Sequence, residues 1–266
     1  MASVGTGQPF IKPSDVREHR VLLPTLVEQQ RIVAILNRAD GIYRKRRASL
    51  EKLGQLEWSV FFTTFDFVSI PRRRLDELVE VEVGLVDPRK EAYGDLPHIA
   101  PQHIIRDTGE LLPYRTARED GVTSGKFLFD NGCVLYSKIR PNLNKVTLAP
   151  EKGICSADMY VIRPKPGLAT REFIWFLLRS IDFLNHALAL SDRANIPKIN
   201  REQLLSYLAP APDIYLQRKF AMHLAAIETL VTRCRTQLVH AEALLRSIKN
   251  DVFSTERGHS VLEGCP

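Results

Sequence analysis

The sequence predicts an α+β fold in which two long helices bracket one mixed α/β module. The first observation is an internal repeat, because residues 9–65 align without a gap with residues 197–253. The second is a stripe of apolar residues at helical spacing along most of each copy. The third is a change to short alternating segments between the copies. Since repeats decide architecture, two copies of one long element around unrelated sequence indicate a frame around a single module.

The copies share polar residues as well as apolar ones. Gln29 matches Gln217 and Arg47 matches Arg235, both at an offset of 188 residues. Two generic zipper helices that only dimerise the protein would have no reason to repeat these polar residues. We therefore expect the two helices to pack against each other, as a parallel or antiparallel pair.

The elements at the start of the chain follow from caps and breaks. A short helix is expected near Ser14–Glu18, in a turn-rich stretch. Pro24 interrupts the chain, and Thr25 followed by Glu28 has the spacing of a capping box. A helix is therefore predicted from this point to about Phe62, with apolar residues at alternating four- and three-residue steps. The second copy carries the same stripe without interruption.

Short segments between turn residues predict strands in the central module, and their short connections favour antiparallel pairing. One helix is predicted over Arg171–Leu188, because Phe173, Phe176 and Leu177 lie on one face. The predicted strands are Leu78–Val83, Pro97–Ile105, Cys133–Ile139, Lys145–Leu148 and Met159–Arg163.

Composition narrows the class of protein. The chain has 266 residues, a net charge of +6 and a pI of about 9.2, a basic excess that permits nucleic-acid binding without proving it. Its four cysteines form no C-x-x-C pair, and no apolar run is long enough for a membrane span. We expect a cytoplasmic protein. Phosphate-loop, nucleophile-elbow and metal-ligand motifs are not found, so no cofactor and no metal are expected.

The densest polar motif is Gly132–Val146, in which an apolar strand leads into basic and amide side chains around Pro141. Arginine and lysine suit phosphates or guanine edges, and asparagine suits adenine edges. The alternative is a solvated hairpin whose basic residues protect a strand edge. The residues that we expect to face DNA here are Tyr136, Lys138, Arg140, Asn142, Asn144 and Lys145.

Two further clusters are weaker candidates. In Ser191–Lys198, the side chains of Arg193, Asn195 and Lys198 can reach DNA, although helix capping and turn formation explain such residues equally well. Pro101–Arg106 carries Gln102 and His103, but a lone histidine is more often a surface or core residue than a ligand.

These motifs together resemble one known family. LLPTLVEQQRIVAIL and LAPAPDIYLQRKF resemble the conserved regions of type I restriction–modification specificity subunits, and GCVLYSKIRPNLNKV resembles their target recognition domains. The resemblance implies a mixed α/β target recognition domain flanked by two long antiparallel coiled-coil helices. It also implies a DNA-reading subunit without catalysis of its own.

The resemblance further implies partners. They are double-stranded DNA, adenine methyltransferase (modification) subunits and a restriction/translocase subunit. A membrane is not expected as a partner. The subunit would direct adenine methylation and restriction to one half of a split site. The alternative is a structural adaptor that docks methyltransferase subunits without DNA readout. The helix residues expected to bind partners are Gln29, Arg31, Arg47, Gln217, Arg218 and Arg235.

The chain departs from the family pattern because it holds one complete recognition domain. Either two copies form a homodimer that reads a palindromic interrupted site, or a second specificity chain supplies the other half. The expected organisation is the tail of a partial recognition domain at 1–23, a first long helix at 24–65, a recognition domain at 66–211, a second long helix at 212–255 and a flexible tail at 256–266.

Overall fold

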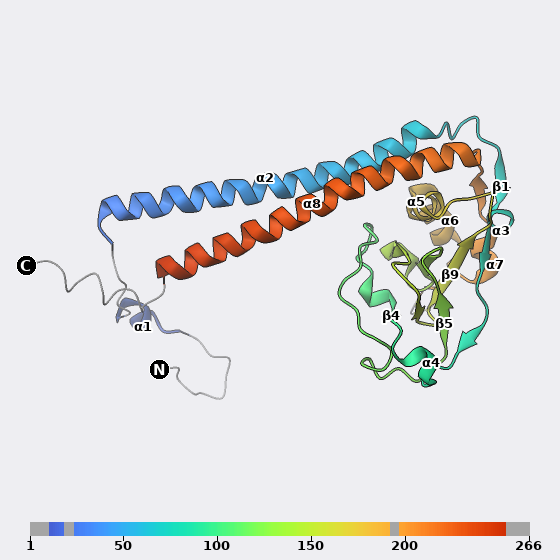
Figure 1. Ribbon diagram of the computed structural model, residues 1–266, viewed down its shortest axis with the longest axis horizontal. Helices are drawn as coiled ribbons and strands as arrows, with labels where there is room; N and C mark the ends of the chain where they lie inside the picture. The colour runs from blue at the N-terminus through green and yellow to red at the C-terminus, as the bar shows by residue number, and fades with distance from the viewer. Residues whose placement is uncertain (1–10, 19–23, 192–196, 254–266) are drawn as a thin grey trace, which may run out of the picture. The chain divides into compact units, whose positions relative to one another are not determined.

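The structure is a computed structural model that describes residues 11–18, 24–191 and 197–253 (Figure 1). The chain divides into two compact units. One contains Met1–Leu53 and Leu230–Pro266, and the other contains Gly54–Thr229. Both long helices contribute to both units, because the division falls at Gly54 and at Thr229. The predicted C-terminal tail at 256–266 lies outside the described residues, as does most of the predicted partial domain at 1–23.

Two helices of 39 and 40 residues supply most of the described residues of the first unit and a part of the second. They are α2 (Leu26–Thr64) and α8 (Ile214–Phe253), and the short helix α1 (Pro13–Glu18) precedes them. The hydroxyl oxygen of Thr25 accepts a hydrogen bond from Glu28 N–H at 3.3 Å, which caps the start of α2. The long helices therefore follow the prediction to within a few residues at each end.

Small side chains line the contact between α2 and α8 in this unit. Ala39 and Ala241 are buried, and the thiol of Cys234 lies 3.4 Å from the carbonyl oxygen of Arg46. In the other unit, Phe61 of α2 contacts Phe220 of α8 with ring centroids 5.4 Å apart. Residue numbers thus rise along α2 as they fall along α8, so the two helices are antiparallel.

The second unit contains three sheets. Their strand orders are β1-β10, β2-β9-β6-β7 and β3-β5-β8-β4, and every pairing is antiparallel except that of β4 with β8. The strands are β1 (Arg72–Arg74), β2 (Val79–Val81), β3 (Leu85–Val86), β4 (His98–Ile99), β5 (Lys126–Phe129), β6 (Val134–Ser137), β7 (Val146–Leu148), β8 (Gly153–Cys155), β9 (Met159–Pro164) and β10 (Leu208–Pro210). The helices are α3 (Leu75–Leu78), α4 (Glu91–Gly94), η1 (Pro101–His103), η2 (Pro141–Leu143), α5 (Arg171–Arg179), α6 (Ile181–Leu190) and α7 (Arg201–Leu205).

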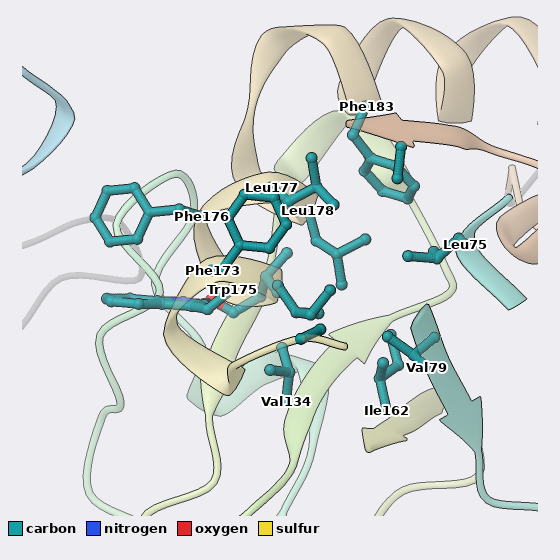
Figure 2. Packing of buried hydrophobic residues seen from close by; sticks show 14 of the residues in the cluster. Leu75, Val79, Val134, Ile162, Phe173, Trp175, Phe176, Leu177, Leu178 and Phe183 are labelled. Atoms are coloured by element: carbon teal, nitrogen blue, oxygen red, sulfur yellow. Dashed lines mark hydrogen bonds between the residues drawn. The ribbon is translucent and has the colours of Figure 1, made fainter. Parts of the chain in front are cut away.

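The sheet containing β6 and β9 is buried on both faces. On one face, Val134 and Ile162 belong to a cluster that includes Phe173 and Phe176 of α5 (Figure 2). On the other face, Leu135 belongs to a second cluster with residues of β4, β5 and β8. Successive side chains of a strand point to opposite faces. Continuous apolar burial along β6 is therefore the expected pattern for a central strand covered on both sides.

An aromatic cluster joins the ends of the long helices to α5. Phe61 lies 5.3 Å from Phe176 and 5.4 Å from Phe65, and Phe220 lies 5.1 Å from Phe176, all between ring centroids. Each of these four phenylalanines is at most 2% exposed. Truncating one buried phenylalanine of this kind costs about 3–5 kcal/mol. The cluster therefore fixes α5 against α2 and α8 within this unit.

The single helix predicted over Arg171–Leu188 is two helices, α5 and α6, which meet at an angle of 61°. Ser180 ends the first helix and caps the second, because its hydroxyl oxygen accepts a hydrogen bond from Phe183 N–H at 3.3 Å. The apolar face continues through the break, which is why helical spacing alone predicted one element. No single helix of the described residues is long and apolar enough to cross a membrane. The bent α5–α6 pair, taken together, reaches that length and apolar composition.

Candidate nucleic-acid interface

The Gly132–Val146 motif forms β6, the first residue of β7 and the turn between these strands, Lys138–Lys145, which we call the basic turn. It contains the short helix η2 between two residues in the left-handed conformation, Arg140 (φ 49°) and Asn144 (φ 45°). Asparagine adopts this conformation readily, but arginine does so at a cost of about 1–2 kcal/mol. Such strain persists only where the surroundings determine the backbone strongly.

Backbone hydrogen bonds hold the first half of the turn against Pro197–Ile199. Arg140 N–H donates to the carbonyl oxygen of Pro197 at 2.8 Å, and Ile199 N–H donates to the carbonyl oxygen of Lys138 at 3.0 Å. This pairing places Lys198 opposite Ile139. The structure therefore brings together two of the sequence clusters, the basic turn and the end of Ser191–Lys198.

A buried asparagine holds the second half of the turn. The amide nitrogen of Asn144 donates to the carbonyl oxygen of Arg179 at 3.0 Å, and Asn144 is 7% exposed. Its own carbonyl oxygen accepts from Asp107 N–H at 3.3 Å. The sequence predicted that Asn144 faces DNA, whereas the structure buries its side chain and bonds it within the chain. Asn144 anchors the turn in two ways: it adopts the left-handed backbone conformation readily, and its buried amide binds the carbonyl oxygen of Arg179.

Arg179, whose carbonyl oxygen accepts the hydrogen bond from Asn144, is itself held by aromatic and backbone contacts. Its guanidinium lies 4.4 Å from the ring centroid of Trp175 and 5.3 Å from that of Trp58, and it donates to the carbonyl oxygen of Asp107 at 3.0 Å. Burial lowers the pKa of Arg179 to about 10, so the group remains charged near neutral pH. This cation is a part of the scaffold under the turn rather than a group available to a ligand.

Two further residues of the motif have partners within the chain. Tyr136 is 2% exposed and packs against Phe183 at 5.6 Å, because even and odd positions of β6 both face apolar layers. The ammonium group of Lys145 donates to the carbonyl oxygen of Pro101 at 2.8 Å, and partial burial lowers its pKa. Tyr136 thus belongs to the core, and Lys145 ties the turn to η1.

Fewer polar side chains of the motif are exposed than the sequence predicted. Arg140 and Asn142 are exposed, as is Lys198 beside them. Lys138 is half-buried, with its ammonium group 5.7 Å from the centroid of the Tyr160 ring. The predicted residues Arg193 and Asn195 lie outside the described residues.

A second loop, which includes Arg106 and Gly109, lies beside the basic turn. Asp107 binds both Asn144 and Arg179 through its backbone, which places exposed Arg106 next to the turn. Gly109 (φ 74°) packs so closely that a Cβ there would overlap the carbonyl oxygen of Val146. Asp107 of the loop and Asn144 of the turn are 37 residues apart in sequence, so no local pattern links them.

The helix residues predicted to bind partners divide into two groups. Gln217 is 0% exposed, and its amide is used within the chain, so it is not available to a partner. The remainder are partly or fully exposed: Gln29, Arg31, Arg47, Arg218 and Arg235.

The geometry suits recognition of an extended anion. Arg140, Lys198 and Arg106 present exposed cations, and Asn142 adds an amide that can donate and accept. Within the described residues, no group of three or more histidine, cysteine or acidic side chains is placed to hold a metal ion.

Comparison with known proteins places the chain among restriction–modification proteins. The chain is 29% identical over 295 aligned positions to the Escherichia coli type I restriction enzyme EcoDI specificity subunit. The match covers 95% of this chain, which spans 65% of the length of that relative.

Solved structures agree on the fold. One structure, from work on complex assembly and conformational transition of the type I R-M system, matches with a TM-score of 0.57 and 20% identity over 94% of this chain and 65% of that chain. A type I S subunit from M. genitalium matches with a TM-score of 0.59 and 12% identity, over 92% and 66% of the two chains. The family model for the type I restriction modification DNA specificity domain matches residues 71–238, more than half of the chain. The chain therefore belongs to the type I restriction modification DNA specificity family.

Proposed function

We propose that this chain is a non-catalytic specificity subunit that reads one half of a split DNA site and directs adenine methylation and restriction to it. The observation that carries this proposal is the rigid basic turn, which exposes Arg140 and Asn142 inside the matched region and places Lys198 beside them. A preorganised turn loses little conformational entropy on binding. Exposed arginine and asparagine are also the side chains best suited to base edges.

The proposed contacts differ in kind. Arg140 and Asn142 are assigned to base edges, because they project from the constrained part of the turn. Lys138, Lys198 and Arg106 are assigned to phosphates, because lysine is a point charge and Arg106 is already held by Asp107 at 3.0 Å. Partners of the complex are proposed to be adenine methyltransferase subunits and a restriction/translocase subunit, bound through the long helices.

The first experiment selects duplexes from a random library with the full chain and its methyltransferase subunits at fixed salt. Arg140→Ala should weaken binding to the selected sequence by about 1–3 kcal/mol and relax one position of it. The matched control is Arg73→Ala, which removes an exposed arginine from β1. Equal affinities for the Arg140 variant and the unmodified chain would remove Arg140 from the interface.

A salt titration separates phosphate contacts from base contacts. Lys198→Ala should reduce the slope of log K against log salt by about 0.9, the value for one neutralised phosphate in B-DNA. It should weaken binding to selected and random duplexes alike. An intact methyltransferase complex that enriches no sequence would instead support the adaptor function.

The half-site part of the proposal is tested by mapping methylated adenines in the host genome. A palindromic interrupted motif would support a homodimer, because symmetric proteins read symmetric sites. An asymmetric split motif would support a second specificity chain. A methylated motif that is continuous rather than split would contradict the half-site assignment.

A further inference from the structure

The middle of α2 carries most of the net charge of the chain. From Arg38 to Lys52 there are six basic and two acidic side chains, which gives a net charge of +4 where the whole chain has +6. The aligned segment of the second repeat, from Ala226 to His240, has two basic side chains and one acidic side chain, a net charge of +1 with histidine neutral. The two helices are copies of one repeat, so packing within the frame does not explain why only α2 is strongly basic here.

Some of these cations are already neutralised on the helix surface. The guanidinium of Arg44 lies 2.8 Å from the carboxylate of Asp40, and that of Arg47 lies 3.9 Å from Glu51. The other four cations are exposed, and their side chains form no ion pair or hydrogen bond with any other described residue: Arg38, Lys45, Arg46 and Lys52. Half of the charge of this segment is therefore available to a ligand without breaking a contact.

Three of the four unpaired cations line one hollow on α2. The hollow measures about 500 Å³, and small side chains lie between the cations, so that a bulky ligand can approach the helix closely. Its described lining consists of Ile42, Lys45, Arg46, Ala48, Ser49 and Lys52. We call Lys45, Arg46 and Lys52 the basic stripe.

Arg46 occupies a position that is packed in the other repeat. Its counterpart Cys234 is 6% exposed, and the Cys234 thiol lies 3.4 Å from the carbonyl oxygen of Arg46. The side chain of Arg46 is nevertheless exposed. An apolar side chain would stabilise the helix pair more than an exposed cation does, because burial of apolar surface is the main favourable contribution to packing. Arg46 therefore indicates a role outside the frame.

The basic stripe suits the phosphates of a nucleic acid better than a protein helix. Lys45 and Lys52 are seven residues apart, which is about 10.5 Å along the helix axis and close to the Debye length of about 10 Å at 0.1 M salt. Their potentials therefore overlap near physiological salt. A helical protein partner would need apolar anchors at three- and four-residue steps, whereas Ile42 is the one large apolar residue of the described lining.

We propose that the basic stripe binds the phosphate backbone of duplex DNA without reading its sequence. The stripe belongs to the first unit and the basic turn to the second, so the two are separate sites on the chain. The proposal rests on the proposed function for the choice of duplex DNA as the ligand. It adds to that function a contact that supplies affinity and carries no sequence information.

The test measures how salt weakens binding of the full chain to a random-sequence duplex of about 30 base pairs, about 100 Å long. The stripe variant carries Lys45→Gln, Arg46→Gln and Lys52→Gln, since glutamine retains a high helix propensity. Its slope of log K against log salt should be smaller by about 2.7, at about 0.9 for each phosphate contact. Between about 50 and about 200 mM salt, the affinity of the unmodified chain should therefore fall about 40-fold more than that of the variant.

A matched control removes the same charge elsewhere. It carries Arg73→Gln, Lys90→Gln and Lys152→Gln, all at exposed positions of the second unit. We expect its slope to stay close to that of the unmodified chain. An equal fall in both variants would reduce the effect to net charge and overturn the proposal, and so would an unchanged slope in the stripe variant.

A second variant separates charge from folding. Lys45→Arg, Arg46→Lys and Lys52→Arg together keep all three charges and should keep the full slope, with the helix content measured by circular dichroism. Loss of the slope in this variant would attribute the effect to the structure of α2 and overturn the proposal.

Failure of this proposal is distinguishable from failure of the proposed function. If the basic turn reads no bases, selection enriches no sequence, yet the slope for random duplexes still depends on the basic stripe. If the stripe does not bind DNA, a sequence is enriched and Arg140→Ala weakens binding to it, while the stripe variant keeps the slope of the unmodified chain. An unchanged slope together with lost methyltransferase binding would make the stripe a protein-docking surface and would also overturn the proposal.

Discussion

Replacing Gln217 with alanine should destabilise the second unit more than any other single change at a polar residue of the repeat. The side chain is 0% exposed and makes three hydrogen bonds, all with backbone groups. Each buried hydrogen bond contributes about 0.5–1.5 kcal/mol net, and each partner left unsatisfied costs about 1–3 kcal/mol. We therefore expect a loss of about 3–4 kcal/mol in the free energy of unfolding.

The repeat supplies a matched control for this prediction. Gln29→Ala removes one hydrogen bond from a partly exposed residue and should cost less than about 1 kcal/mol. Gln217→Glu is a sharper variant, since a carboxylate at this position would face the carbonyl oxygens of Pro212 and Leu168. At neutral pH it should destabilise the unit more than alanine does, because an unpaired charge would be buried against two acceptors.

Urea unfolding, monitored by tryptophan fluorescence, measures the free energy of unfolding of the second unit. The chain has two tryptophans, Trp58 and Trp175, and both lie within Gly54–Thr229. The expected result is a large fall in the midpoint for the Gln217 variant at an unchanged slope. A loss below about 1 kcal/mol, or one equal to that of Gln29→Ala, would refute the view that this amide holds the recognition domain to the repeat.

Three further predictions concern the scaffold around the basic turn, each checked by urea unfolding. Gly109→Ala should cost more than about 2 kcal/mol because its Cβ would overlap a backbone carbonyl, whereas Gly121→Ala, also at positive φ but with open space around it, should cost only about 1 kcal/mol. Asn144→Ala should cost about 2–3 kcal/mol and Asn144→Gly less, since glycine keeps the left-handed backbone and loses only the buried hydrogen bond; equal losses would show that the conformation is unimportant. Burial lowers the pKa of His103, so its neutral form favours the folded state; this stability is present above the unfolded pKa and is lost as pH falls through the folded pKa. His103→Asn should therefore flatten the pH dependence of stability below pH 7, by at most about 1.4 kcal/mol per pH unit, and an unchanged slope would contradict this assignment.

The sequence predicted the long helices well because their signal is local and repeated. Apolar spacing, the Thr25 cap and the Pro24 break all lie within a few residues of the element they define. The sequence did not predict β1, because that strand is three residues long and pairs with β10 more than a hundred residues away. Strands this short carry no periodic pattern, and only the fold pairs them.

The strand and turn of the candidate site were predicted, but the buried contacts that hold the turn were not. The motif's polar residues were expected to face DNA. Asn144 is nevertheless buried and binds the carbonyl oxygen of Arg179, and the half-buried Lys145 binds that of Pro101. Composition cannot distinguish an amide that contacts a ligand from one that satisfies a buried acceptor, because both need the same chemistry. A usable sign was available for the helix break at Ser180, since a serine followed by Asp182 is a typical start of a helix.

The contacts beneath the basic turn explain why the proposed readout belongs at this place in the fold. Base recognition requires side chains held to within about 0.5 Å, which loops achieve only when their backbone is fixed by packing. Asn144 fixes the turn to the carbonyl of Arg179, and the guanidinium of Arg179 lies against the ring of Trp58 at the end of α2. Two short contacts thus connect the turn to a helix that continues into the frame. The backbone of Arg140 is therefore held by contacts with buried parts of the fold, while its side chain is exposed.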